Sequence, residues 1–261
     1  FYFIKEYFSF NLNFFTIKTS FLYSLPLIPS FFVTWFNGQF DKILLFKYQT
    51  LSDVAIFGAT ARLSVFILLF ISIFRQSWLP FSMEIIHKEI EFVNKTYKNF
   101  YKLYITLFLT TAFFFVTFSS EFFYMILPKS YNSGISIFPL MITSHILHGL
   151  ASVVNIGIVI TKKSYHNLYA STLGTVVNVV ASFLLIPIFG ILGASFGTFL
   201  SELIFVIYFI YFSNKLCPVQ FSYKELIYPV VSFLFLSFFL NRISFLDINL
   251  IYILFIKLIL F

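Results

Sequence analysis

The sequence predicts an all-α integral membrane protein folded as a polytopic helix bundle. Of its 261 residues, 60% are hydrophobic and only 10% are charged, and the mean hydropathy is +0.95 over the whole length. A soluble domain has about 25% charged residues and about half of its residues apolar. Most side chains here must therefore face lipid or one another. The apolar pattern also lacks the roughly 10-residue dyad segments of an outer-membrane barrel, so we expect helices.

About 20 apolar residues cross the hydrocarbon core as a helix, and polar breaks divide this chain into eight such segments. In order they are residues 19–46, 54–79, 100–127, 134–160, 165–189, 191–212, 226–240 and 249–261. The sequence begins at Phe1 without Met and stops inside the last apolar run. We therefore expect it to be a piece of a longer protein.

The first segment has two prolines near its start and a charged pair near its end. Pro26 and Pro29 lack a backbone N–H group, so they should kink the helix or open its first turns. Asp41 and Lys42 should end the span at the outer surface, where they pair locally and fix the turn before "KYQTLSD". The alternative is an interfacial ion pair of little energetic value.

Basic residues alternate across the seven connections, which predicts the orientation of the chain. Because cytoplasmic loops carry the excess of Lys and Arg, the richer side should be cytoplasmic. That side holds Lys5, Lys18, Arg75, Lys88, Lys95, Lys98, Lys102, Lys162, Lys163, Lys215 and Lys224, and the other holds Lys42, Lys47, Lys129 and Arg242. Residues 1–18 are then a cytoplasmic connector.

The longest cytoplasmic connection reads "SMEIIHKEIEFVNKTYKNFYK". Its apolar residues stand among charged neighbours, at Ile85, Ile86, Ile90, Phe92 and Val93. This pattern suggests an amphipathic helix lying at the inner membrane surface. A solvated, charged loop is the equal alternative.

Two tracts of small residues predict close helix contacts. "STLGTVVNVVASF" has Ser171, Gly174, Asn178 and Ser182 at spacings of three and four, and "GILGASFGTFLSE" has Gly190, Gly193, Gly197 and Ser201. Each tract gives a helix one stripe where another backbone can come close. Static helix packing is the simpler interpretation, and a surface that slides during alternating access is the alternative.

Arg62 and Glu202 are charges inside apolar segments. A charge at the bilayer centre costs at least about 2.5–3.5 kcal/mol on insertion scales, so each should face protein or water. Arg62, a turn or two into its segment, either faces the central cavity or extends toward the outer interface. Glu202 is too short to reach the interface, and we expect it to face a cavity.

His145 and His148 stand three residues apart and share one helix face. No neighbouring acidic residue or cysteine completes a metal site, so we expect the two histidines to line a water-filled path.

The single Cys217 excludes an internal disulfide and multi-cysteine metal motifs. The chain also lacks a Gly-rich phosphate loop, a Walker lysine and a nucleophile elbow. We expect no enzyme activity, no catalytic residues, no cofactor, no metal and no nucleic-acid partner.

The order of several motifs resembles a known family. "FLYSLPLIPSFFVTWFNGQFDKILLFKYQTLSDVAIFGATARLS", then "SWLPF", then "LLIPIFGILGASFGTFLSE" is similar to polysaccharide flippases of the O-antigen and capsule type, in the multidrug/oligosaccharidyl-lipid/polysaccharide exporter superfamily. The likeness covers residues 18–212. Ser24 replaces the usual Gly of the family motif, and Asp41-Lys42 stands where the family commonly has Asp-Arg. Lys42 keeps the charge but lacks the bidentate fork of Arg.

The resemblance implies a bundle of about 12 to 14 helices in two lobes around a central cavity. Residues 19–212 would form the second, six-helix lobe, and residues 213–261 would add two helices, the last one truncated. The implied task is to flip undecaprenyl-diphosphate-linked oligosaccharides across the bacterial cytoplasmic membrane, for O-antigen, lipopolysaccharide or other surface polysaccharide. Arg62, His145, His148 and Asn178 would line the substrate cavity, and Glu202 would bind H⁺ or Na⁺.

The partners implied are the lipid-linked substrate, membrane lipids and polysaccharide assembly machinery. A drug/cation antiporter of the same superfamily is the main alternative. A membrane polysaccharide polymerase is a third possibility, but it usually needs a large external loop, and the outer connections here are short.

Overall fold

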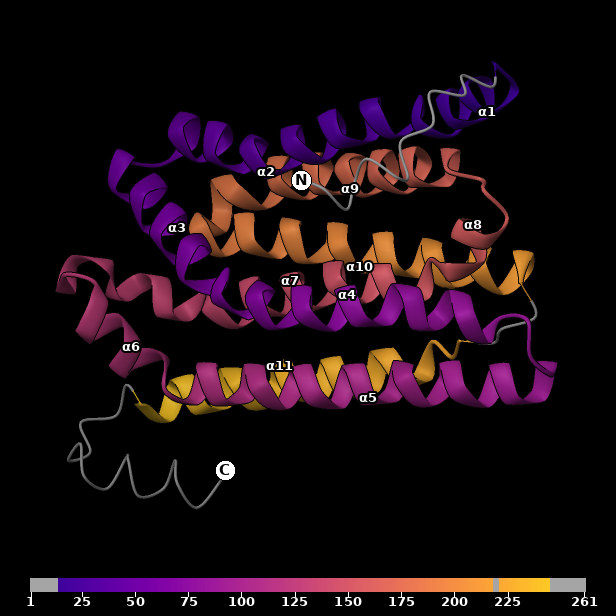
Figure 1. Cartoon of the computed structure of the whole chain (residues 1–261). Coiled ribbons are helices and arrows are strands. Elements are labelled where there is room, and N and C mark those ends of the chain that lie inside the picture. The colour runs from indigo at the N-terminus through magenta and orange to yellow at the C-terminus, as the bar shows by residue number, and fades with distance from the viewer. Residues whose placement is uncertain (1–13, 218–220, 245–261) are drawn as a thin grey trace, which may run out of the picture.

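The computed structural model describes residues 14–217 and 221–244, with side chains described up to residue 238. These residues form a bundle of long helices whose axes run roughly parallel (Figure 1). The helices are α1 (Phe14–Ser24), α2 (Leu27–Tyr48), α3 (Leu51–Ser64), α4 (Phe66–Ile85), α5 (Ile90–Thr117), α6 (Ser119–Ile126), the 3₁₀ helix η2 (Lys129–Ser136), α7 (Phe138–Val154), α8 (Ile156–Ile160), α9 (Tyr165–Phe189), α10 (Ile191–Leu216) and α11 (Lys224–Ser244).

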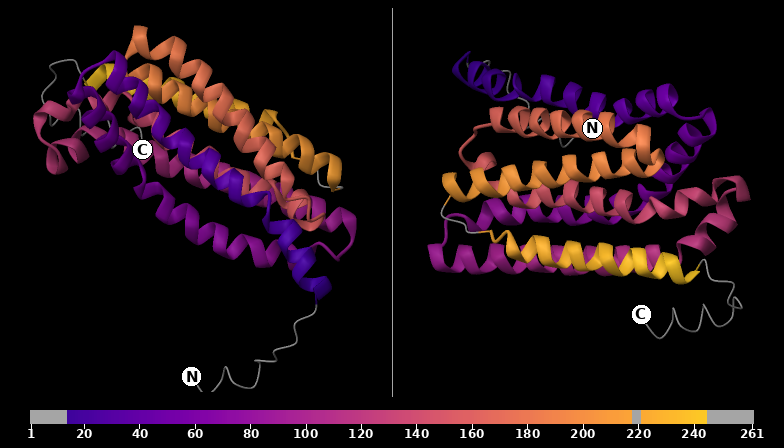
Figure 2. Two further views of the ribbon diagram at one scale, coloured as in Figure 1. Left: turned by 90° about the horizontal axis from the view of Figure 1, so that it is seen from above. Right: turned by 180° about the vertical axis from the view of Figure 1, so that it is seen from behind.

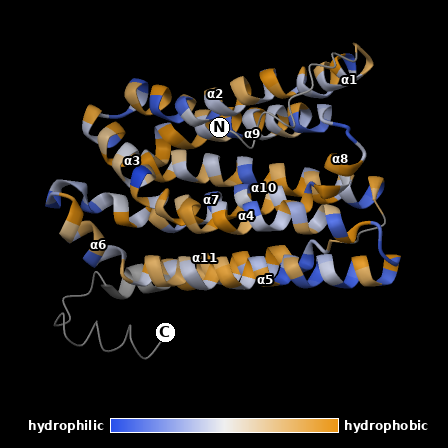
Figure 3. Cartoon of the chain, in the orientation of Figure 1, coloured by the Kyte–Doolittle hydropathy of each residue, from blue (hydrophilic) through white to orange (hydrophobic). Residues whose placement is uncertain are grey.

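The helix bundle confirms the predicted fold class. Five helical stretches of the described residues are long and apolar enough to cross a membrane, and η2 with α7 would make a sixth if that pair, bent by 56°, is one span. Hydrophobic residues run along the length of the helices (Figure 3). Helix α11 covers the predicted seventh segment, whereas the predicted eighth, residues 249–261, lies outside the described residues.

The connections gather at two opposite ends of the bundle (Figures 1 and 2). One end has the α4–α5 turn, the start of α9, the end of α10 and the start of α11. The other end has the α2–α3 and α9–α10 turns together with η2. The predicted cytoplasmic residues Lys88, Lys163 and Lys224 all lie at the first end. Connections predicted to share one side of the membrane therefore share one end of the bundle. Arg75 differs from the prediction, because it lies inside α4 rather than in a connection.

The charged connection 82–102 forms neither a separate surface helix nor a loop. Residues 86–89 make a short turn, and α5 begins at Ile90 and continues to Thr117. Ile85 and Val93 are buried in the bundle, whereas Ile90 and Phe92 are exposed. The apolar residues that suggested an amphipathic helix are therefore divided between two helices that cross the bundle.

Pro26 interrupts the first span, as predicted. Helix α1 ends at Ser24, and α2 begins at Leu27. Helix α1 extends back to Phe14, so the last residues of the predicted connector 1–18 are helical.

The turn between α9 and α10 depends on Gly190, whose φ of +55° is open to few residues with a side chain. The Gln49 side chain closes this turn by donating from Nε2 to the Ile186 carbonyl at 3.0 Å.

An aromatic core joins α4, α5 and α7. Trp78, Tyr97 and Tyr104 are almost fully buried, and the Trp78 and Tyr97 rings meet edge to face. The tyrosine hydroxyls donate to backbone carbonyls, Tyr97 to Ser82 at 2.7 Å and Tyr104 to Ile146 at 2.9 Å. The buried tips of these two tyrosines are thereby satisfied, whereas the buried Nε1 of Trp78 has no hydrogen-bond partner among the described residues.

Helices α2, α9 and α10 pack closely through small residues. A β-carbon added at Gly197 of α10 would collide with Ser182 of α9, and one added at Gly174 of α9 would lie 3.1 Å from the Ser201 hydroxyl. The two small-residue tracts therefore face each other, as predicted. This close approach brings polar side chains of three helices together.

Candidate functional site

A cavity of about 320 Å³ lies between α2, α3, α4, α7 and α10. Its charged and titratable lining residues are Asp41, Lys42, His145, His148 and Glu202. All five were singled out from the sequence, and the fold brings them to one space although they are spread over 160 positions of the chain. We call this space the inner cavity.

Asp41 forms the most strongly hydrogen-bonded point of the inner cavity. It is only 2% exposed, and its carboxylate accepts hydrogen bonds from Ser182 Oγ at 2.7 Å, Thr198 Oγ1 at 2.8 Å and Asn178 Nδ2 at 3.1 Å. These donors lie on α9 and α10, so Asp41 ties α2 to both helices. These hydrogen bonds satisfy the buried carboxyl group and compensate part of the cost of burying it.

This geometry corrects the predicted interfacial pair. Helix α2 does not end at Asp41 but continues to Tyr48, so the residue stands inside the bundle. Lys42 bonds instead to Gln39 Oε1, at 3.2 Å, and no salt bridge joins it to Asp41 among the described residues. The turn before α3 is fixed by Thr50 and Asp53, which form a reciprocal capping box.

Glu202 and His148 meet across the inner cavity, with His148 Nδ1 3.1 Å from Glu202 Oε2. The Glu202 side chain is 16% exposed and that of His148 is 41% exposed. One helical turn away from His148, His145 Nε2 lies 3.0 Å from Ser64 Oγ at the end of α3. The histidines thus share one face of α7, as predicted, and contact two different helices.

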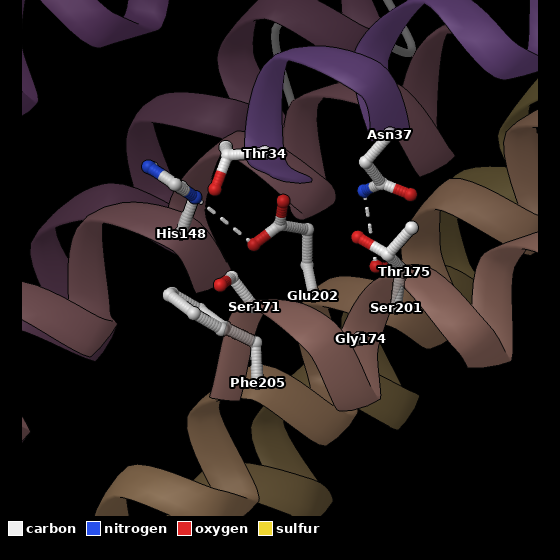
Figure 4. Close-up of a pocket in the computed structure, with 9 residues that line it drawn as sticks. All are labelled: Thr34, Asn37, His148, Ser171, Gly174, Thr175, Ser201, Glu202 and Phe205. Atoms are coloured by element: carbon white, nitrogen blue, oxygen red, sulfur yellow. Dashed lines mark hydrogen bonds and ion pairs between the residues drawn. The ribbon is translucent and has the colours of Figure 1, made fainter. Parts of the chain in front are cut away.

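Beside Glu202 lies a much smaller space, lined by α2, α9 and α10 as well as α7 (Figure 4). Its volume, counted as the space that the centre of a water molecule can occupy, is about 20 Å³. Oxygen-bearing side chains surround it, from Thr34, Asn37, Ser171, Thr175, Ser201 and Glu202. We call it the Glu202 pocket.

Arg62 lines a third cavity, of about 700 Å³, toward the end of the bundle that carries the α2–α3 turn. Lys42 and His145 line this outer cavity as well as the inner one, so they stand between the two. None of its lining residues is acidic. Arg62 is exposed, and the part of the chain that is described offers it no ion pair.

Asn178 is placed differently from the prediction. It is fully buried, its amide is bonded to Asp41, and it lines neither the inner nor the outer cavity. Asn178 therefore positions Asp41 and does not contact the space of either cavity.

Sequence reasoning missed Thr34 and Asn37. The signal was present in α2, where Thr34, Asn37 and Asp41 follow one another at spacings of three and four and so share one helix face. A polar stripe on an otherwise apolar span indicates contact with protein or water.

Within the described residues, no group of three His, Cys, Asp or Glu side chains could hold a metal ion.

No family model matches the sequence, and no curated protein does. A solved structure shares the fold, the outward-facing conformation of a multidrug resistance MATE family transporter of the MOP superfamily. The alignment covers 85% of this chain and 52% of that chain, with a TM-score of 0.60 and 16% sequence identity. The chain therefore spans about half the length of that transporter, and its fold is one found in a membrane transporter.

Proposed function

We propose that the protein is a transporter that flips lipid-linked oligosaccharides across the bacterial cytoplasmic membrane for surface polysaccharide synthesis. This chain would form one lobe of a two-lobed exporter and most of its two additional helices. The head of such a substrate combines sugars with an anionic diphosphate, whereas its tail remains in lipid. A hydrated, cationic cavity lowers the cost of moving that head through the bilayer core.

The observation that supports an anionic head is the charge of the outer cavity. Lys42 and Arg62 line it, and none of its lining residues is acidic. Arg62 is exposed and has its planar fork of donors available, which suits two phosphate oxygens at once. Its volume of about 700 Å³ is within the range of cavities that hold ligands of drug size.

A coupling ion would act at Glu202. The two carboxylates of the inner cavity differ, because Asp41 is occupied by three donors whereas Glu202 meets His148 alone among the described residues. A carboxylate with uncommitted lone pairs is the one that can take up H⁺ or Na⁺ and release it as the lobes move.

A second candidate is a drug/cation antiporter. The solved structure of similar fold is described as a multidrug resistance transporter, and the carboxylates of Asp41 and Glu202 in the inner cavity suit a cationic amphiphile. A flippase would bind an anionic head in the outer cavity, whereas an antiporter would bind a cationic drug in the inner cavity. A transport assay with each substrate therefore distinguishes the two functions.

The test is transport by the full-length protein in liposomes. The flippase predicts that a fluorescent undecaprenyl-diphosphate oligosaccharide becomes accessible in the opposite leaflet, and that cells lacking the protein accumulate lipid-linked units and lose surface glycan. An antiporter instead expels a cationic dye and leaves the lipid-linked units unmoved. Dye export without flipping would refute the flippase.

A further inference from the structure

We infer that a groove on the exposed face of α5 binds an anionic glycerophospholipid. Its phosphate would lie at the lysines in the first half of the helix, and one acyl chain would lie in the groove. Helix α5 stands at the edge of the bundle, beside α11 (Figure 1). This surface is separate from the inner and outer cavities, so the inference does not depend on the proposed function.

The groove has a volume of about 430 Å³ and is formed by α5 alone. Its lining residues are Leu103, Thr106, Leu107, Thr110, Thr111 and Phe114. The threonines are smaller than the leucines and the phenylalanine around them, so they leave a hollow between larger side chains. From Leu103 to Phe114 the helix rises about 16 Å, which is about half of the roughly 30 Å thickness of the hydrocarbon core. The groove therefore spans about one leaflet, as an acyl chain does.

The lysines of α5 form a cationic cluster beside one end of the groove. Lys95, Lys98 and Lys102 are exposed, and they are the basic residues of this helix. Lys98 and Lys102 share one carboxylate oxygen, Glu225 Oε1, at 3.5 and 3.3 Å. Lys95 has no ion pair among the described residues, and the one acidic residue of α5, Glu91, lies in its first turn. The cluster therefore keeps a net positive charge.

The cluster and the groove lie on one face of α5. Lys95, Asn99, Lys102, Thr106 and Thr110 follow one another at spacings of three and four, and all five are exposed. Hydrophilic residues are more frequent toward the start of α5 (Figure 3). Lysine and asparagine side chains can donate hydrogen bonds to phosphate oxygens. The face thus has the same order as a phospholipid, with a polar head followed by an apolar chain.

Charge complementarity favours an anionic phospholipid over other occupants. A zwitterionic lipid would bring an ammonium group close to the lysines. The predicted eighth segment, residues 249–261, contains Lys257 and no acidic residue, and a second copy of the chain would add its own net charge of +7. A phospholipid with an uncharged glycerol head adds only the negative phosphate, and basic clusters beside membrane-spanning helices attract such lipids.

The experiment is native mass spectrometry of the delipidated full-length protein, mixed with equal amounts of phosphatidylglycerol and phosphatidylcholine. We expect the first lipid bound to be phosphatidylglycerol. Lys95→Gln should weaken its binding roughly fivefold, the effect of about one lysine beside an anionic lipid. Thr110→Trp should also weaken it, because the indole ring fills the groove.

The matched controls are Lys215→Gln on α10 and Leu173→Trp on α9. Both positions are exposed and lie outside the groove, so these variants should bind the lipid like the unchanged protein. Each variant is first shown to be monodisperse by gel filtration.

Equal binding of the two lipids, or binding that Lys95→Gln leaves unchanged, would overturn the anionic head. Binding that Thr110→Trp leaves unchanged would show that the chain does not lie in the groove and would equally refute the site. Undecaprenyl phosphate is then added as a competitor. If it binds more tightly than phosphatidylglycerol, the occupant is an isoprenoid lipid, which contradicts the inference but leaves the proposed function intact.

Discussion

Asp41 and Glu202 line one cavity, yet their carboxylates have opposite surroundings. Asp41 accepts hydrogen bonds from three side chains of two neighbouring helices, whereas Glu202 contacts His148 and also lines a second, smaller pocket. A satisfied buried carboxylate holds helices in register, and an unsatisfied one is available for a ligand. We therefore propose different roles for the two residues, structural for Asp41 and ion binding for Glu202.

Asp41→Asn should destabilise the bundle although the two side chains have the same shape. An amide offers one acceptor oxygen and an NH₂ group, so at least one of the donors from Asn178, Ser182 and Thr198 loses its bond to residue 41. Each buried donor left unsatisfied costs about 1–3 kcal/mol. The melting temperature in detergent should fall, whereas Glu84→Gln, an exposed acid-to-amide change on α4, should leave it unchanged. A melting temperature equal to that of the unchanged protein would show that Asp41 is not a structural junction.

Gly197→Ala should also destabilise the protein, by about 1–3 kcal/mol from overpacking. The new β-carbon would collide with Ser182 and would lie 2.7 Å from Asn178 Oδ1. The matched control is Gly38→Ala in α2, where nothing lies within 4 Å of the added atom and the helix gains propensity. Opposite shifts of the melting temperature are expected. Equal shifts would mean that α9 and α10 adjust freely to the extra volume.

Arg62→Ala should abolish flipping of a diphosphate-linked oligosaccharide while the protein still inserts. Arg62→Lys should retain part of the activity, because it keeps the charge but loses the bidentate fork. Lys129→Ala, at an exposed position of η2 outside the outer cavity, is the control and should be active. Surface glycan is the measurement in cells. Normal glycan with Arg62→Ala would reduce Arg62 to an interfacial anchor.

The orientation of the bundle can be tested with single cysteines in a Cys217→Ser background. Lys47→Cys and Lys129→Cys lie at one end, and His87→Cys and Lys224→Cys at the other, all at exposed positions. A membrane-impermeant maleimide added to intact cells should label the first pair, and the second pair only after permeabilisation, because basic connections remain cytoplasmic. The reverse pattern would invert the predicted topology.

Local patterns in the sequence were enough to predict some of the helices, whereas the predicted segments 100–127 and 134–160 are each divided into shorter helices. The predicted segment 165–189 coincides with α9, and the predicted start at Ile191 with that of α10, because a glycine at φ +55° separates them. Hydropathy and Lys/Arg bias act over a single span, so neither depends on which helices are neighbours. The small-residue tracts likewise identified the faces of α9 and α10 that touch.

Contacts between distant segments were decided by the tertiary structure alone. Asp41 was predicted to pair with the adjacent Lys42, yet its partners stand 137 to 157 positions away. Which residues face each other across helices depends on the rotation and depth of each helix in the bundle, and packing sets both. The pocket formed by Asn37, Thr175 and Glu202 exists for the same reason, because α2, α9 and α10 are close enough there to enclose one small space.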